Sequence, residues 1–207
     1  MNNQNTIEHE KEALKFLERD FNQCFQQMRH YDTQIFGILR FSFTGYTTLI
    51  SVGLGLYQFG LKESKNFTLP IIAALSIGFV IGLFMFTLAM RNRIYFVRIA
   101  RYINEQRGLF LQFKPFGFEN KSTMYTDCKR PAFFNWHSSQ AYLCYIMAGL
   151  NSALCGILLF IIFSSYCYDL IIVMGGSFAL FIIQLLIAIS YLNLLENKPK
   201  SKAIFEK

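Results

Sequence analysis

Four long stretches without a charged residue constrain the fold more than any other feature of the sequence. They cover residues 41–61, 66–90, 131–168 and 170–195. Each is long enough for the roughly 20 apolar residues that an α-helix needs to cross the hydrocarbon core of a bilayer. The sequence therefore predicts an all-α integral membrane protein with four transmembrane helices in two hairpins, in contact with the lipid bilayer.

The distribution of basic residues predicts the orientation of these helices. Of the 20 Lys and Arg residues, nine lie in 91–135 and four follow position 196, whereas the first hairpin loop holds Lys62 and Lys65. Cytoplasmic loops of membrane proteins carry an excess of Lys and Arg. We therefore expect both termini and the central loop in the cytoplasm. The net charge of +7 then reflects topology, and no direct nucleic-acid partner is expected.

The same pattern divides the chain into five segments. Because no turn signal follows Met90, the second span is expected to continue as a basic helix. The segments are a cytosolic heptad helix (1–34), a first transmembrane hairpin (35–90), a basic, aromatic-rich cytosolic helix and loop (91–138), a second transmembrane hairpin (139–195) and a basic cytosolic tail (196–207).

Residues 6–35 carry an apolar heptad repeat. One seam position holds Ile7, Leu14, Phe21, Met28 and Ile35, and the other holds Glu10, Leu17, Cys24 and Tyr31, with Glu10 as the only charged member. Such a repeat is typical of an amphipathic helix or a coiled coil. Packing against the protein's own cytosolic segment, a homo-oligomeric coiled coil and a membrane-surface helix all remain open, although mixed charges on the outer face argue against the last.

The first span carries a polar stripe along its length. At 100° per residue its members fall within an arc of about 100°. They are Arg40, Thr44, Thr47, Thr48, Ser51 and Gln58, with Gly37 and Gly55 between them. Small and hydroxylated residues of this kind form helix-packing faces in membranes. The stripe is therefore either a packing face or the lining of a water-filled pore.

Two amides lie inside the second hairpin. Asn151 and Gln184 are about equally far from the outer turn at a rise of ~1.5 Å per residue, which brings them to the same depth. Amides in a bilayer are unfavourable unless paired, so we expect these two to face each other or a shared third group. In the second span, Ala74, Gly78 and Gly82 form a small-residue ridge that predicts a close helix contact, either with another copy or within the chain.

A charged cluster follows the second span. Arg91, Arg98, Arg101 and Glu105 share one helical face, and Arg107 lies nearby. We interpret them as a face for a cytosolic partner or ligand.

The spacing of the cysteine and histidine residues matches neither a catalytic nor a metal-binding motif. The cysteines have no CxxC spacing, and His9, His30 and His137 lie far apart, so neither zinc nor another cofactor is expected. None of the four spans contains an Asp or Glu, which weighs against a proton- or cation-coupled transporter. The sequence therefore does not predict an enzyme.

Short motifs carry a resemblance to a known group of proteins. They comprise Tyr31 and Asp32 at the end of the heptad helix and, after the second span, Arg98, Arg101, Tyr102, Asn104, Glu105 and Arg107. With two hairpins around them, they resemble small bacterial four-span membrane proteins of unassigned activity, some of which are thought to be membrane effectors of anti-phage defence systems. The resemblance implies a multi-pass protein of the bacterial inner membrane with a role in antiviral defence.

Three functions are compatible with these features. The leading hypothesis is a homo-oligomeric pore-forming effector that perturbs or permeabilises the inner membrane when a soluble cytosolic partner or a ligand engages residues 1–34 and 91–135. The alternative is a non-conducting membrane anchor that recruits a soluble partner protein. A small-molecule transporter comes third, because the hairpins show no sign of broken helices.

Overall fold

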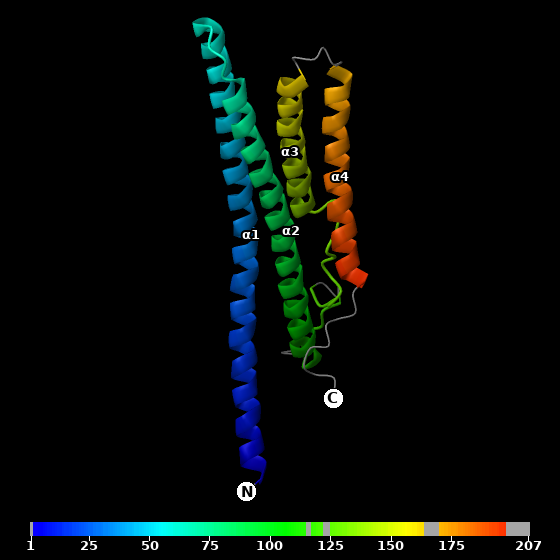
Figure 1. Cartoon of the computed structure of the whole chain (residues 1–207). Coiled ribbons are helices and arrows are strands. Elements are labelled where there is room, and N and C mark those ends of the chain that lie inside the picture. Colours follow the sequence, from blue (N-terminus) through cyan, green and yellow to red (C-terminus); the bar gives the residue numbers. More distant parts are fainter. Residues whose placement is uncertain (1, 115–116, 122–124, 164–169, 198–207) are drawn as a thin grey trace. The chain divides into compact units, whose positions relative to one another are not determined.

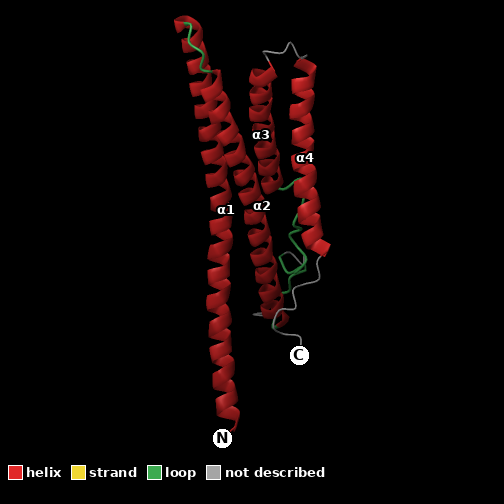
Figure 2. Ribbon diagram, viewed as in Figure 1, coloured by secondary structure: helices red, strands yellow, loops and turns green. Residues whose placement is uncertain are grey.

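The computed structural model describes residues 2–114, 117–121, 125–163 and 170–197. Its regular elements are helices: α1 (Asn2–Glu63), α2 (Thr68–Gln112), α3 (Ser139–Phe163) and α4 (Leu170–Asn197), as Figures 1 and 2 show. All four are long and apolar enough to cross a membrane. The prediction of an all-helical, multi-pass membrane protein is therefore confirmed. Residues 198–207 of the predicted tail lie outside the described part.

Helix α1 runs without a break through Asp32 and Thr33, although both residue types are common helix caps. The Thr33 hydroxyl donates to the Arg29 carbonyl 3.0 Å away, one turn back. This hydrogen bond is formed inside the helix, so Thr33 does not act as the N-cap of a new helix. A single helix therefore joins the heptad segment to the first apolar stretch.

The helix ends follow from local chemistry. After α1, Ser64 adopts a positive φ of 54°, and the Lys65 N–H donates to the Gly60 carbonyl at 2.9 Å, which satisfies one of the last carbonyls of the helix. The Asn66 side chain accepts from the Thr68 N–H at 2.9 Å and starts α2. Ser138 accepts from the Ala141 N–H at 3.1 Å and starts α3.

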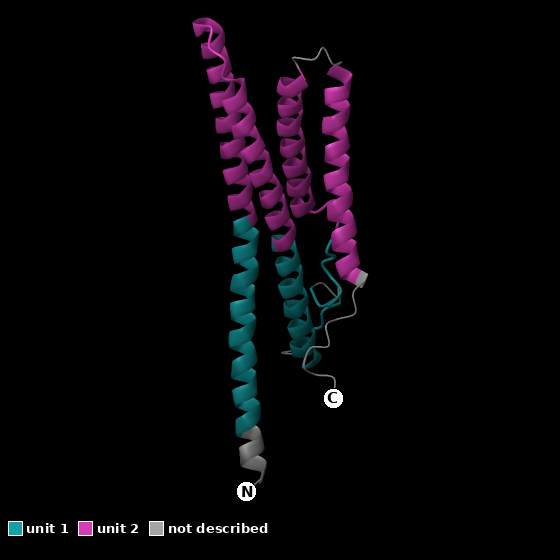
Figure 3. Ribbon diagram, viewed as in Figure 1, with its two compact units in different colours: residues 1–34, 92–133 teal, residues 35–91, 134–207 magenta. Residues whose placement is uncertain are grey.

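The chain divides into two compact units, coloured separately in Figure 3. Unit 1 comprises residues 1–34 and 92–133, and unit 2 comprises residues 35–91 and 134–207. In unit 1, the buried apolar side chains include Val97, Ala100, Ile103 and Phe133.

Unit 2 contains most of the apolar stretches, and the described part of its core includes three clusters of buried residues. They are formed by Phe86, Met90, Cys144, Met147, Ala148 and Ala188; by Tyr46, Ile71, Leu75 and Leu154; and by Ile35, Ala89 and Leu143. Because lipid is as apolar as these side chains, close packing and interhelical hydrogen bonds must hold such helices together.

Candidate functional site

A buried hydrogen-bond network crosses the core of unit 2. The Tyr46 hydroxyl donates to Oδ1 of Asn151, and Nδ2 of Asn151 donates to Oε1 of Gln184 at 2.8 Å. Gln184 in turn donates through Nε2 to the Ser152 hydroxyl at 3.3 Å. The Ser152 hydroxyl donates to the Ala148 carbonyl, 2.7 Å away. Asn151 is 0% exposed and Gln184 3%, so the two amides are satisfied by each other and by hydroxyl groups rather than by water.

Gly82 brings the backbone of α2 against this network. A Cβ at position 82 would collide with the Tyr46 hydroxyl and with Oδ1 of Asn151. Residues of four helices therefore meet here: Tyr46 of α1, Gly82 of α2, Asn151 of α3 and Gln184 of α4. We call this group the polar junction.

The small-residue ridge of α2 packs within the chain at its two glycines. A Cβ at Gly78 would collide with the Leu49 side chain of α1, and Gly82 faces the polar junction. Ala74, the first member of the ridge, is exposed. Similarly, a Cβ at Gly156 of α3 would collide with the Ser177 side chain of α4. Small residues thus permit close helix approach at several points of unit 2.

The polar stripe of α1 faces away from this core. Its eight members are all exposed: Gly37, Arg40, Thr44, Thr47, Thr48, Ser51, Gly55 and Gln58. The opposite face holds the buried residues Ile35, Ser42 and Tyr46. No described part of the chain covers the stripe.

One hydroxyl of the stripe is satisfied by its own helix. Thr48 donates to the Thr44 carbonyl at 2.8 Å, the bond one turn back that Thr commonly forms in membrane helices. Within lipid, Arg40 and Gln58 carry groups too polar to be stable without a protein or water partner.

In unit 1, the predicted partner face separates into two sets. Arg98 and Glu105 are exposed, as is Arg91, which belongs to unit 2. Arg101 instead donates through Nε to the Pro131 carbonyl at 3.0 Å, and its guanidinium lies 4.7 Å from the Phe133 ring centroid.

Arg107 lies between two aromatic rings of unit 1. Its guanidinium is 5.6 Å from the ring centroid of Phe21 and 5.4 Å from that of Tyr125. Both distances are typical of cation–π contacts.

Two buried side chains of α2, whose role the sequence did not predict, hold the loop of residues 127–133. The buried Arg93 donates to the Phe133 carbonyl at 2.9 Å and to the Ala132 carbonyl at 2.6 Å. The buried Asn104 donates to the Asp127 carbonyl at 3.1 Å and to the Arg130 carbonyl at 2.9 Å. These side chains replace the backbone partners that a loop without secondary structure lacks. Alternating basic and apolar residues gave no signal that these two would turn inward.

The heptad helix contacts α2 through polar and aromatic groups. Oδ2 of Asp20 accepts from the Tyr102 hydroxyl and from Nε2 of Gln106, each at 2.7 Å. The rings of Tyr31 and Tyr95 stack with centroids 5.6 Å apart. Tyr31 belongs to the heptad seam, so the seam packs within unit 1 at this position, and Asp20 adds polar contacts.

Asp20 also changes the acidity of Tyr102. The bond from the Tyr102 hydroxyl to the Asp20 carboxylate raises the tyrosine pKa above its usual value, and partial burial and the carboxylate charge act in the same direction. Tyr102 therefore remains a neutral donor throughout the physiological range.

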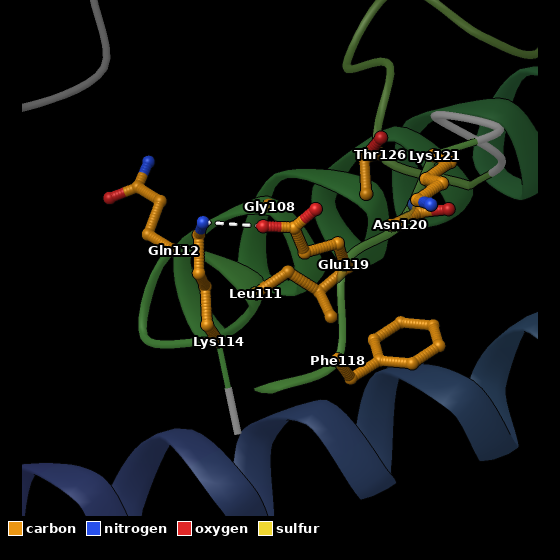
Figure 4. A pocket seen from close by; sticks show the side chains of 9 residues that line it. All are labelled: Gly108, Leu111, Gln112, Lys114, Phe118, Glu119, Asn120, Lys121 and Thr126. Atoms are coloured by element: carbon orange, nitrogen blue, oxygen red, sulfur yellow. Dashed lines mark hydrogen bonds and ion pairs between the residues drawn. The ribbon is translucent and has the colours of Figure 1, made fainter. Parts of the chain in front are cut away.

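A shallow cavity of about 390 Å³ lies at the end of α2 (Figure 4). Lys114 and Glu119 form an ion pair at 2.6 Å in its lining. The remaining lining residues are Gly108, Leu111, Gln112, Phe118, Asn120, Lys121 and Thr126. With two lysines and one glutamate, this lining is weakly positive.

Metal-binding groups do not cluster in the described ranges. No group of three His, Cys, Asp or Glu side chains among those residues is placed to hold a metal ion. Cys24, Cys128, Cys144 and Cys155 are free thiols, and Cys167 lies outside the described part.

The chain matches no family model, no curated protein and no solved structure.

Proposed function

We propose that this protein is a homo-oligomeric, multi-pass protein of the bacterial inner membrane that permeabilises the membrane on engagement of its cytoplasmic face. The observation that carries the proposal is the exposure of the whole polar stripe of α1, from Gly37 to Gln58, within an otherwise apolar unit. A helix face with an arginine, a glutamine and four hydroxyl groups is unfavourable against lipid. Stripes from several copies that meet around an axis would give these groups each other or water as partners.

The interior of a single copy supports the same proposal. The polar residues at the centre of unit 2 are hydrogen-bonded to one another, and Gly82 packs directly against them. A conducting path therefore fits better between copies, along α1, than through the core of one copy.

The trigger is proposed to act on unit 1. Arg98 and Glu105 expose charged groups there, whereas Arg93, Arg101 and Asn104 are engaged in holding the loop. A soluble partner or a ligand on the cytoplasmic side would meet the exposed pair first. A role in anti-phage defence rests on the resemblance described above, and phage plaque formation on cells with and without the gene tests it.

Leakage from liposomes tests permeation. Thr47→Leu and Ser51→Leu replace polar groups of the stripe by apolar side chains that are compatible with lipid. We expect both to abolish ion leakage, or toxicity in cells, while the oligomers stay intact in crosslinking.

Thr48 and Thr87 provide a matched pair for the same assay. Both are exposed, and each hydroxyl donates to a carbonyl one turn back, at 2.8 Å for Thr48 and 2.9 Å for Thr87. Thr48 belongs to the stripe and Thr87 to α2. We expect Thr48→Leu to reduce leakage and Thr87→Leu to leave it unchanged.

A non-conducting anchor is the second candidate. The internal hydrogen bond of Thr48 favours it, because a hydroxyl that is satisfied within its own helix needs no water and suits a dry packing face. Ion flux that survives all three stripe substitutions, or that never occurs, would establish this alternative.

A further inference from the structure

Helix α1 is attached to the rest of unit 2 by few buried side chains. Within unit 2, the buried residues of α1 are Ile35, which packs against Ala89 and Leu143, then Ser42, Tyr46 and, near the end of the helix, Gly60. The Ser42 hydroxyl donates to the Ile38 carbonyl of its own helix at 2.9 Å. The Tyr46 hydroxyl instead donates to Asn151 of α3. Tyr46 thus supplies a directional bond between α1 and the core.

Glycines of α2 restrict how α1 can be rotated about its own axis. Gly82 leaves room for the Tyr46 hydroxyl, and Gly78 leaves room for the Leu49 side chain. One turn further, a Cβ at Gly53 would lie 3.8 Å from the Ile71 side chain, at ordinary contact distance. Two side chains that enter gaps above two glycines restrict rotation of the helix about its axis.

The direction of the polar stripe follows from that rotational setting. At 100° per residue, Thr44, Thr48 and Ser51 lie about 140–160° around α1 from Tyr46. The face that Tyr46 holds against the core and the face that points away from it are therefore rigidly linked. Any rotation that displaces Tyr46 turns the stripe by the same angle.

The network is also arranged so that α1 can be released alone. Asn151 bonds to Gln184 through its amide nitrogen and to Tyr46 through its amide oxygen. Loss of the Tyr46 bond therefore leaves the Asn151–Gln184–Ser152 chain intact. Helices α3 and α4 would remain joined while α1 turns.

We propose that Tyr46 is the positioning residue of the stripe: its bond to Asn151 above Gly82 sets the direction in which the stripe faces a second copy, and its release turns α1 and changes the contact between copies. This inference rests on the proposed function, because it takes the stripe as the contact between copies.

Cysteine crosslinking in liposomes can measure both the rotation of α1 within one copy and the contact between copies. In a chain with its five native cysteines replaced by alanine, Ser51→Cys reports contact between copies at the stripe. The pair Gly53→Cys and Ile71→Cys reports the setting of α1 against α2 within one copy. Each reporter is then combined with Tyr46→Phe, which removes only the hydroxyl, or with Gly82→Ala, which places a methyl group at the Tyr46 hydroxyl.

We expect both variants to lower the Gly53–Ile71 crosslink and the Ser51 crosslink about threefold or more, as expected for loss of one interhelical hydrogen bond in a membrane. The matched controls are Tyr57→Phe, at an exposed tyrosine of α1, and Gly45→Ala, where a Cβ would meet nothing within 4 Å. Neither control should change either yield.

The outcomes separate this inference from the proposed function. No Ser51 crosslink in the parent protein would mean that copies do not meet at the stripe, and the proposed function would fail. A Gly53–Ile71 crosslink unchanged by Tyr46→Phe and by Gly82→Ala would overturn the positioning role, whether or not copies associate. A change of that crosslink with a constant Ser51 yield would overturn the link between Tyr46 and the contact between copies.

Discussion

At the scale of single residues, the polar junction shows how a neutral network persists in an apolar core. Asn151 is fully buried, yet its oxygen accepts from Tyr46 and its nitrogen donates to Gln184. Amide groups cannot lose their hydrogen bonds inside a membrane without a large free-energy penalty. A buried amide therefore needs hydrogen-bond partners at its own depth on neighbouring helices.

The junction gives a direct prediction for Asn151→Leu. This substitution leaves the Tyr46 hydroxyl and the Gln184 amide oxygen without the partners they have now. We expect a loss of about 1–3 kcal/mol in the free energy of unfolding, the usual penalty of unsatisfied buried groups. Thermal unfolding in detergent measures it.

Gln184→Leu should destabilise the protein by a similar route, because Asn151 would lose its acceptor. Since both changes break one shared bond, the double variant should lose less than the sum of the two single losses. Unchanged thermal stability in both single variants would show that the amide pair does not contribute to folding.

Among the helices, α2 contributes residues to two different structures, the core of unit 2 and the loop of unit 1. Its apolar part supplies Gly78 and Gly82 to the core of unit 2. Its basic part supplies Arg93, Arg101 and Asn104 to the carbonyls of the loop between Asp127 and Phe133. The loop lacks the regular backbone hydrogen bonds of a helix or a sheet, so its conformation depends on each of these side-chain donors.

Loop stability can therefore be tested at Asn104. Asn104→Leu removes both donors to the Asp127 and Arg130 carbonyls, and we expect faster tryptic cleavage after Lys129, which is exposed. The rate should rise several-fold because cleavage follows the population of locally open loop. Arg98→Ala, at an exposed position of the same helix, is the control and should leave the rate unchanged. Equal rates in the two variants would contradict the holding role of Asn104.

At the scale of the whole molecule, the distribution of basic residues predicts the topology. Cys128 is exposed in the segment expected on the cytoplasmic side, close to Lys129 and Arg130. Lys62 and Lys65 lie on the predicted outer side.

Labelling should show this arrangement. A membrane-impermeant maleimide should label Cys128 in inverted vesicles and not in intact cells or spheroplasts, because positive segments stay on the cytoplasmic side. Cys128→Ala controls for the other thiols. Labelling of Cys128 from the outside would reverse the orientation and move unit 1 away from any cytosolic partner.

Three properties follow from the sequence alone: the four helices long enough to cross a membrane, the continuation of the second into a basic helix, and the shared depth of the two amides. These properties are local: the length of an apolar stretch, the absence of a turn signal and the rise per residue do not depend on other helices. The sequence did not predict Tyr46, the third member of this network, because a tyrosine alone in a span gives no signal of its partner.

The rotation of each helix about its axis, by contrast, depends on packing between helices. Rotation places Tyr46 in the polar junction and the stripe outside, turns Arg93 and Asn104 toward the loop, and leaves Arg98 and Glu105 exposed. In sequence, Arg93 and Arg98 are equally plausible surface residues. Which face of a helix is covered depends on the shapes of its neighbours, here the gaps above Gly78 and Gly82, and such complementarity between distant segments cannot be read from the periodicity of one helix.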